Sequence, residues 1–345
     1  MRKEVELILL AVLKKKSKEE CNRITELLAD EMDWIFVGGI LLNHRLSGYF
    51  YTGLNDVQKS KLPKELRAIF KLIIFAQAQR QTLINREVDK INTELVKHKV
   101  HFAGIKGILL GTEVYDTGDR RSNDVDLLVY EQDLSTLDTA MREMGYIQSS
   151  VPNGQLIEAS KKEKLIQRMN YHDLVPYVKK VDDIILEVDI NFLFDGKDNP
   201  VDKFLYEDGL YEYKGGDYAI TGLSSRMHLA FLLVHFYREA TNSLWTNDKR
   251  DLTFYKIVDI INYIRHIKAQ IDCKELVEVF RRLNIAGKCY YVFTVLSEFY
   301  QDDFVEKMIP LLKADATDKL GEIYEMTEKK YVKREQSFFS SIFGE

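Results

Sequence analysis

The sequence predicts an α+β protein that is predominantly helical, with a small mixed β-sheet core flanked by N- and C-terminal helical regions. Three observations predict it. Proline is rare, with 5 residues among 345, so helices can run without interruption. Apolar residues recur at helical spacing through the first and last parts of the chain. Only the middle part holds short apolar runs bounded by glycine, or apolar and acidic residues in alternation, which are typical of strands.

The first region, residues 1–96, is predicted to be helical. Its opening stretch, MRKEVELILLAVLKKKSKEE, places apolar residues between charged ones. Glu4 and Glu6 interrupt the apolar run and Lys14 ends it, which favours an amphipathic helix over a secretory leader. Residues 62–100 carry the clearest helical spacing, with Pro63 at a first-turn position and charged residues on the outer face.

The middle region, residues 97–222, is predicted to hold the sheet. The run VHFAGIKG predicts a buried strand, GILLGTEVYD a short helix, and DVDLLVY a second strand. Residues 133–146 predict a helix that Asp133 opens as an acidic cap and Gly145 closes. In VDDIILEVDINFLF apolar and acidic positions alternate, which predicts a third strand. The polar segment 150–182 carries no clear pattern.

The last region, residues 223–345, returns to helical spacing. Its first helix is SSRMHLAFLLVHFYREA, for which Ser224 or Ser225 is the expected cap. The tail SFFSSIFGE is rich in aromatic and small residues. It either frays or packs back on the body of the protein.

Charge and composition exclude some classes of function. The net charge of −5 argues against a general grip on long nucleic acid, which needs a basic face. No apolar run is long enough to span a bilayer, so no membrane partner is expected. The 3 cysteines lie far apart without metal-ligand spacing, which favours free thiols in a reducing, cytoplasmic location.

An Asp-x-Asp pair opens the second predicted strand. Asp124 and Asp126 are two residues apart, so their side chains lie on the same face, while Val125, Leu127 and Val129 face a core. Two carboxylates this close repel each other unless a cation lies between them. Mg²⁺ prefers a few carboxylate oxygens and keeps positions open for phosphate and water. The pair therefore predicts a magnesium site.

The third predicted strand adds Glu187 and Asp189, again on one face. If the two strands are neighbours, three or four carboxylates converge. Such a cluster can hold metal ions and take a proton from an attacking hydroxyl group. The alternation does not distinguish Glu187 from Asp189 as the third carboxylate. The structural alternative for a lone Asp-x-Asp is a solvated strand edge.

Basic and small residues precede the acidic pair. Lys106 and Gly107 lie where the first strand gives way to a helix, and backbone N–H groups at such a point can approach a phosphate. Lys106 adds a positive charge to the same place. Arg120 precedes the carboxylates and can pair with a triphosphate or with Asp124; a solvated loop is the alternative.

The stretch from residue 101 to 146 resembles the uncharacterised nucleotidyltransferase family of the polymerase-beta-like superfamily. The upstream helix and the C-terminal helices are similar to that family as well, so that the resemblance covers roughly residues 60–270. The residues that carry it are Lys106, Gly107, Tyr115, Arg120, Asp124 and Asp126, with weaker support from His228, His235 and Asp259.

The resemblance implies transfer of a nucleoside monophosphate from a nucleoside triphosphate to a hydroxyl-bearing acceptor, with release of pyrophosphate. ATP is the expected nucleotide, Mg²⁺ the expected cofactor, and the acceptor is an unknown small molecule, peptide or protein. The implied catalytic residues are Asp124, Asp126, Glu187 and Asp189, the implied metal ligands Asp124, Asp126 and Asp189, and the implied nucleotide contacts Lys106, Gly107, Arg120 and His235.

Two other functions stay open on the sequence. One is a catalytically inactive nucleotide-binding or regulatory protein, and the other is a toxin–antitoxin partner that modifies a macromolecule. Neighbouring like charges favour the enzyme, because they are costly to keep unless a cation uses them. His228 is interpreted as a core histidine, and His235 as either a core residue or a nucleotide contact.

Overall fold

The computed structural model describes residues 1–345 except 196–199, 217, 247–252, 317–321, 326–328 and 345. The chain forms two compact units, and both are discontinuous in sequence. Unit 1 comprises residues 1–78, 114–121 and 232–345, and unit 2 comprises residues 79–113 and 122–231. The three regions predicted from the sequence, with boundaries at residues 96/97 and 222/223, follow chain order, and that division stays a prediction.

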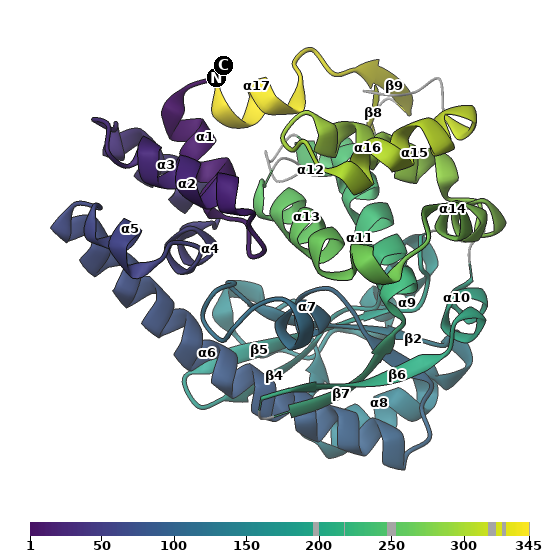
Figure 1. Ribbon diagram of the computed structural model, residues 1–345. Coiled ribbons are helices and arrows are strands. Elements are labelled where there is room, and N and C mark those ends of the chain that lie inside the picture. The colour runs from purple at the N-terminus through teal and green to yellow at the C-terminus, as the bar shows by residue number, and fades with distance from the viewer. Residues whose placement is uncertain (196–199, 217, 247–252, 317–321, 326–328, 345) are drawn as a thin grey trace. The chain divides into compact units, whose positions relative to one another are not determined.

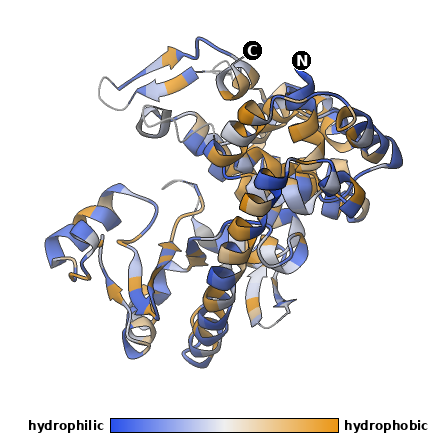
Figure 2. Ribbon diagram, turned by 90° about the vertical axis from the view of Figure 1, so that its left-hand side faces the viewer, coloured by the Kyte–Doolittle hydropathy of each residue, from blue (hydrophilic) through white to orange (hydrophobic). Residues whose placement is uncertain are grey.

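Unit 1 is built mainly from helices, whose apolar faces turn inward (Figure 2). Its elements are α1 (Lys3–Ala11), α2 (Lys18–Leu27), α3 (Trp34–Asn43), α4 (Ser47–Thr52), α5 (Asp56–Ser60), α12 (Ser243–Thr246), α13 (Tyr255–Ile267), α14 (Cys273–Arg282), α15 (Ala286–Ser297), α16 (Asp303–Leu312), α17 (Phe338–Phe343) and the hairpin β8 (Glu322–Glu325) and β9 (Lys330–Lys333). The aromatic tail packs back, since Phe338 and Phe343 of α17 are buried.

Unit 2 carries the sheet (Figure 1). Its elements are β1 (Phe102–Gly104), α7 (Gly107–Glu113), β2 (Asp124–Val129), α8 (Leu134–Glu143), β3 (Ile147–Gln148), α9 (Lys161–Asn170), β4 (Tyr177–Val181), β5 (Ile184–Asn191), α10 (Val201–Glu207), β6 (Leu210–Gly215) and β7 (Tyr218–Leu223). Two long helices, α6 (Lys64–Lys97) and α11 (Ser225–Ala240), contribute residues to both units.

The sheet is mixed, with the strand order β3-β4-β5-β2-β1-β7-β6 in the described residues. Strand β2 pairs in parallel with β5 and antiparallel with β1. One face is covered by the second half of α6 and by α8, which bury a shared apolar core (Figure 1). That core contains Ile84, Val88, Ile91 and Leu95 of α6, Leu137, Ala140 and Met141 of α8, and Val125, Leu127, Val129, Leu186, Val188 and Ile190 of the strands.

These features confirm the α+β, predominantly helical class and all three predicted strands. The cap prediction for α8 was wrong: Asp133 makes no side-chain cap, because its carboxylate accepts hydrogen bonds from the backbone N–H and Nδ1 of His101 at 2.9 and 2.7 Å. Ser224 does cap α11, accepting from the N–H of Met227. No helix in the described ranges is both long and apolar enough to cross a membrane.

Candidate active site

Four carboxylates meet on one face of the sheet in unit 2. The parallel register of β2 and β5 sets Asp124 opposite Glu187, and Asp126 opposite Asp189. Because side chains alternate along a strand, all four lie on the face that points away from the α6–α8 core. The structure thus brings together the acidic residues that the sequence placed on two separate strands.

Burial varies across this cluster. Asp126 is only 5% exposed, whereas Asp124 is exposed at the start of β2. Glu187 and Asp189 are partly buried. The cluster therefore runs from solvent inward, and the carboxylate of Asp126 lies at its buried end.

Lys106 supplies a positive charge to the buried end. Its Nζ donates a hydrogen bond to Oδ1 of Asp126 at 2.6 Å. The residue adopts a left-handed backbone conformation, with φ of +52°, directly before α7 begins at Gly107. Burial lowers the pKa of Lys106, but the carboxylates of Asp126, Asp189 and Asp124 together outweigh it, and the pKa lies above its ordinary value. The amine is therefore charged.

Burial and neighbouring like charges disfavour the ionised form of two of these carboxylates. Burial, followed by the charge of Asp126, raises the pKa of Asp189 to about 8, although Lys106 opposes the rise. Burial, followed by the charge of Asp124, also raises the pKa of Glu187. Further positive charge at this face would therefore stabilise the ionised forms of Asp189 and Glu187.

This donor set fits Mg²⁺. All of the candidate ligand atoms are carboxylate oxygens, which are the ligands that this hard cation prefers. The parallel register holds the two carboxylate pairs on rigid neighbouring strands, and the exposed end at Asp124 leaves an approach from solvent. A role for Asp124, Asp126 and Asp189 as its ligands stays a prediction.

Arg80, which the sequence analysis missed, fixes the loop that leads into β2. Its Nε donates to the backbone carbonyl of Ser122 at 3.2 Å, and its Nη2 to that of Asn123 at 3.1 Å. Both carbonyls directly precede Asp124. Nothing in the helical spacing of α6 distinguishes this arginine from its exposed neighbours, so only the folded structure reveals it.

Close packing at β1 places α7 beside the carboxylates. A Cβ on Gly104 would lie 2.7 Å from Cγ1 of Ile220, so that glycine lets β1 approach β7. Tyr218 of β7 donates a hydrogen bond through its hydroxyl to the carbonyl of Ile108 at 3.0 Å. These contacts set the turn at Lys106 and Gly107 against the sheet.

Arg120 has different partners from those the sequence suggested. It belongs to unit 1, where its Nε donates to Oδ2 of Asp259 at 2.9 Å. The hydroxyl of Tyr49 donates to the other oxygen of Asp259, also at 2.9 Å. Tyr115, another residue of the motif, accepts a hydrogen bond from Asn262 in the same unit. A role for Arg120 in nucleotide binding stays a prediction.

The two histidines of α11 differ in environment. His228, in unit 2, is fully buried, and burial lowers its pKa to about 3, so its ring is neutral. His235, in unit 1, lies 3.1 Å from Nη2 of Arg238 through Nδ1, and 3.5 Å from Glu239 through Nε2. A core position for His228 agrees with the sequence interpretation, whereas a nucleotide contact for His235 stays a prediction.

Comparison with known proteins agrees with the motif. A search of curated proteins finds no match. The model of a family described as uncharacterised nucleotidyltransferase matches residues 30–301, which include the carboxylate strands, Lys106 and most of the surrounding helices. Since this match covers well over half of the chain, the protein belongs to that nucleotidyltransferase family.

Proposed function

We propose that the carboxylate face of unit 2 is the catalytic centre of a Mg²⁺-dependent nucleotidyltransferase. It would transfer a nucleoside monophosphate, with ATP as the expected donor, to a hydroxyl-bearing small molecule, peptide or protein. The observation that carries this proposal is the register of β2 and β5, which sets two pairs of carboxylates opposite each other beside Lys106. Membership of a nucleotidyltransferase family supports it.

The chain's own residues would hold the reactants and move one proton. Asp124, Asp126 and Asp189 would hold Mg²⁺, which when bound neutralises triphosphate charge and acidifies the acceptor hydroxyl. The acceptor oxygen forms a bond to the α-phosphorus while the bond to the pyrophosphate oxygen breaks. Glu187 or Asp189 would accept the hydroxyl proton, since both lie on the same face of the sheet as Asp124 and Asp126.

Positive groups would meet the phosphates. Lys106 lies at the buried end of the carboxylate cluster, and the backbone of Gly107 follows it in the same turn. A lysine acts as a point charge on phosphate oxygens, so Lys106 can exchange Asp126 for the triphosphate. The family resemblance also implies nucleotide contacts for Arg120 and His235, and we include these contacts and a cytoplasmic location in the proposal.

An inactive regulatory protein is the main competing function. Burying like charges side by side destabilises a fold unless another group offsets them. The cluster retains all four carboxylates, and one of them has its pKa raised to about 8. A protein without turnover has no need of this arrangement, so the cluster favours the enzyme.

Labelled nucleotides test the proposal. The purified protein is incubated with Mg²⁺, a cell extract as the source of acceptors, and ATP, CTP, GTP or UTP labelled at the α-phosphate. We expect label to enter an acceptor with release of pyrophosphate, and the variant Asp126→Asn to lose roughly 1,000-fold of this activity while it stays folded. Asp183→Asn, which alters an exposed residue in the turn before β5, is the matched control. Equal labelling by wild type and Asp126→Asn would refute the assignment.

A further inference from the structure

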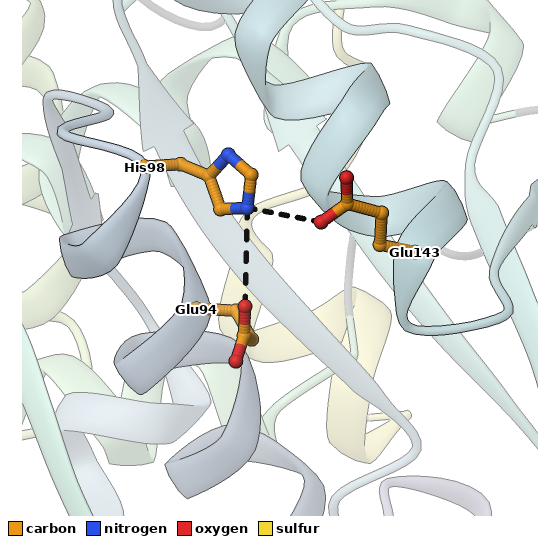
Figure 3. Close-up of side chains that lie close together, drawn as sticks. All are labelled: Glu94, His98 and Glu143. Atoms are coloured by element: carbon orange, nitrogen blue, oxygen red, sulfur yellow. Dashed lines mark hydrogen bonds and ion pairs between the residues drawn. The ribbon is translucent and has the colours of Figure 1, made fainter.

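A second group of metal-ligating side chains lies on the helical side of unit 2, where α6 and α8 end. Glu94 and His98 are four residues apart, and Glu143 is the last residue of α8. Nε2 of His98 lies 3.1 Å from Oε2 of Glu143 and 3.9 Å from Oε2 of Glu94 (Figure 3). One donor atom from each residue lies within 4.8 Å of the other two.

Rigid elements hold these donors. The backbone N–H of His98 still bonds to the carbonyl of Glu94 at 3.0 Å, so both side chains leave the same helical face. Leu95 of α6 and Met141 of α8 are buried in the shared core, which fixes the two helix ends relative to each other. The donors are therefore brought together by the fold and stay partly open to solvent.

Electrostatics at this point favour a cation. Glu94 and Glu143 both lie in the last turn of a helix, where the helix dipole places partial negative charge. Lys97 competes, because its Nζ donates to Oε2 of Glu94 at 2.8 Å. The side chain of Lys97 is 65% exposed, and exposed ion pairs of this kind contribute little. A divalent ion can outcompete it by contacting all three donors at once.

We propose that Glu94, His98 and Glu143 form a binding site for a divalent transition-metal ion of the Zn²⁺ class. An imidazole nitrogen with two carboxylates is a common zinc donor set, and a water can complete the coordination. Mg²⁺ prefers oxygen donors alone, so the histidine separates this site from the carboxylate face. Bound metal would join the ends of α6 and α8 and stabilise the core between them.

Thermal unfolding with added Zn²⁺ tests this site. The purified full-length protein, freed of metal by chelation, is titrated with Zn²⁺, and its melting temperature and binding isotherm are measured. We expect the melting temperature to rise by about 5 °C when Zn²⁺ is 100-fold above its dissociation constant. Mg²⁺ at the same concentration should not reproduce this rise in melting temperature.

Variants assign the effect to the three residues. His98→Ala and Glu143→Gln should each weaken Zn²⁺ binding by roughly tenfold or more and remove most of the thermal shift. His101→Ala, which alters a nearby exposed histidine, should retain both. The proposal is overturned if wild type shows no Zn²⁺-dependent rise, or if His98→Ala and Glu143→Gln keep wild-type affinity. Because none of these substitutions touches the carboxylate face, the outcome is independent of the proposed transferase activity.

Discussion

Each unit buries a group of charged side chains, and the two groups differ in how their charges are partnered. In unit 1, Asp259 accepts hydrogen bonds from Arg120 and from the hydroxyl of Tyr49, so its charge is balanced and both oxygens are occupied. In unit 2, Asp126 and Asp189 face each other across parallel strands, with Lys106 as the nearby positive charge. In the first group the carboxylate has a partner of opposite charge and a hydroxyl donor, whereas the second places several acidic side chains beside one another.

This difference distinguishes a group that stabilises the fold from a group that is a candidate for catalysis. A balanced ion pair contributes to the fold, and removal of one member leaves an uncompensated charge. A cluster of like charges weakens the fold, as the raised pKa of Asp189 indicates, and a bound cation would offset that cost. Substitutions in the two groups should therefore change stability with opposite sign.

Asp259→Asn should give the largest change in stability. It removes the carboxylate that balances Arg120 and leaves that guanidinium buried without its counter-charge, so the free energy of unfolding should fall by about 3 kcal/mol. Urea unfolding followed by circular dichroism measures this loss. Tyr49→Phe, which removes only a neutral donor to the same carboxylate, should cost about 1 kcal/mol. An unchanged urea midpoint for Asp259→Asn would show that the ion pair is not structural.

Arg80→Met adds a third case to the comparison of the two charged groups, because Arg80 donates its hydrogen bonds to backbone carbonyls and not to a carboxylate. Loss of its bonds to the carbonyls of Ser122 and Asn123 frees the loop before Asp124. We expect the turnover number to fall by roughly 10- to 100-fold, since small displacements of metal ligands and bases are costly to catalysis. The dissociation constant for nucleotide, measured separately, should change less than turnover.

Arg86→Met is the matched control for that experiment. Arg86 lies on the same helix and is exposed, so its loss should leave turnover unchanged. If both variants lose turnover equally, the effect comes from the helix as a whole and not from the loop before β2.

Sequence patterns were sufficient for the strands that carry the candidate site. In both β2 and β5 two acidic residues alternate with apolar ones, because one face packs on α6 and α8 while the other bears the acidic residues. The pairing of those strands, and so the meeting of Asp126 with Asp189, depended on a sheet order that alternation alone does not specify. The acidic residues were predictable from the sequence, whereas the register that pairs β2 with β5 was not.

Other features lay outside the reach of the sequence. Strand β4 falls in a segment without clear pattern, since two of its five residues are consecutive lysines, Lys179 and Lys180. The hairpin of β6 and β7 begins with a strand whose residues are mostly exposed, which weakens any hydrophobic signal. Arg120 and Asp259 are 139 residues apart, and no local pattern connects them. Long-range contacts of this kind come from tertiary packing.

The effect of Asp189→Asn is seen as a pH dependence and not as a change in stability at a single pH. In chelator, burial and then Asp126 raise the pKa of Asp189 from 3.8 to about 8 on folding. A raised folded-state pKa means that the folded protein binds the proton more tightly, so this stabilisation is complete below about pH 4 and is lost as pH rises toward 8. The contribution changes by at most about 1.4 kcal/mol per pH unit.

Melting temperatures measured between pH 5 and pH 8 isolate this contribution. Wild type in chelator should melt at lower temperature as pH rises, while Asp189→Asn, which cannot ionise, should show a flatter profile and melt above wild type at pH 8. Added Mg²⁺ should restore more stability to wild type than to the variant, because the ion replaces the proton between the carboxylates. Parallel profiles for the two proteins would mean that Asp189 does not carry the excess charge, and the contrast between the two groups would then rest on Asp124, Asp126 and Glu187 alone.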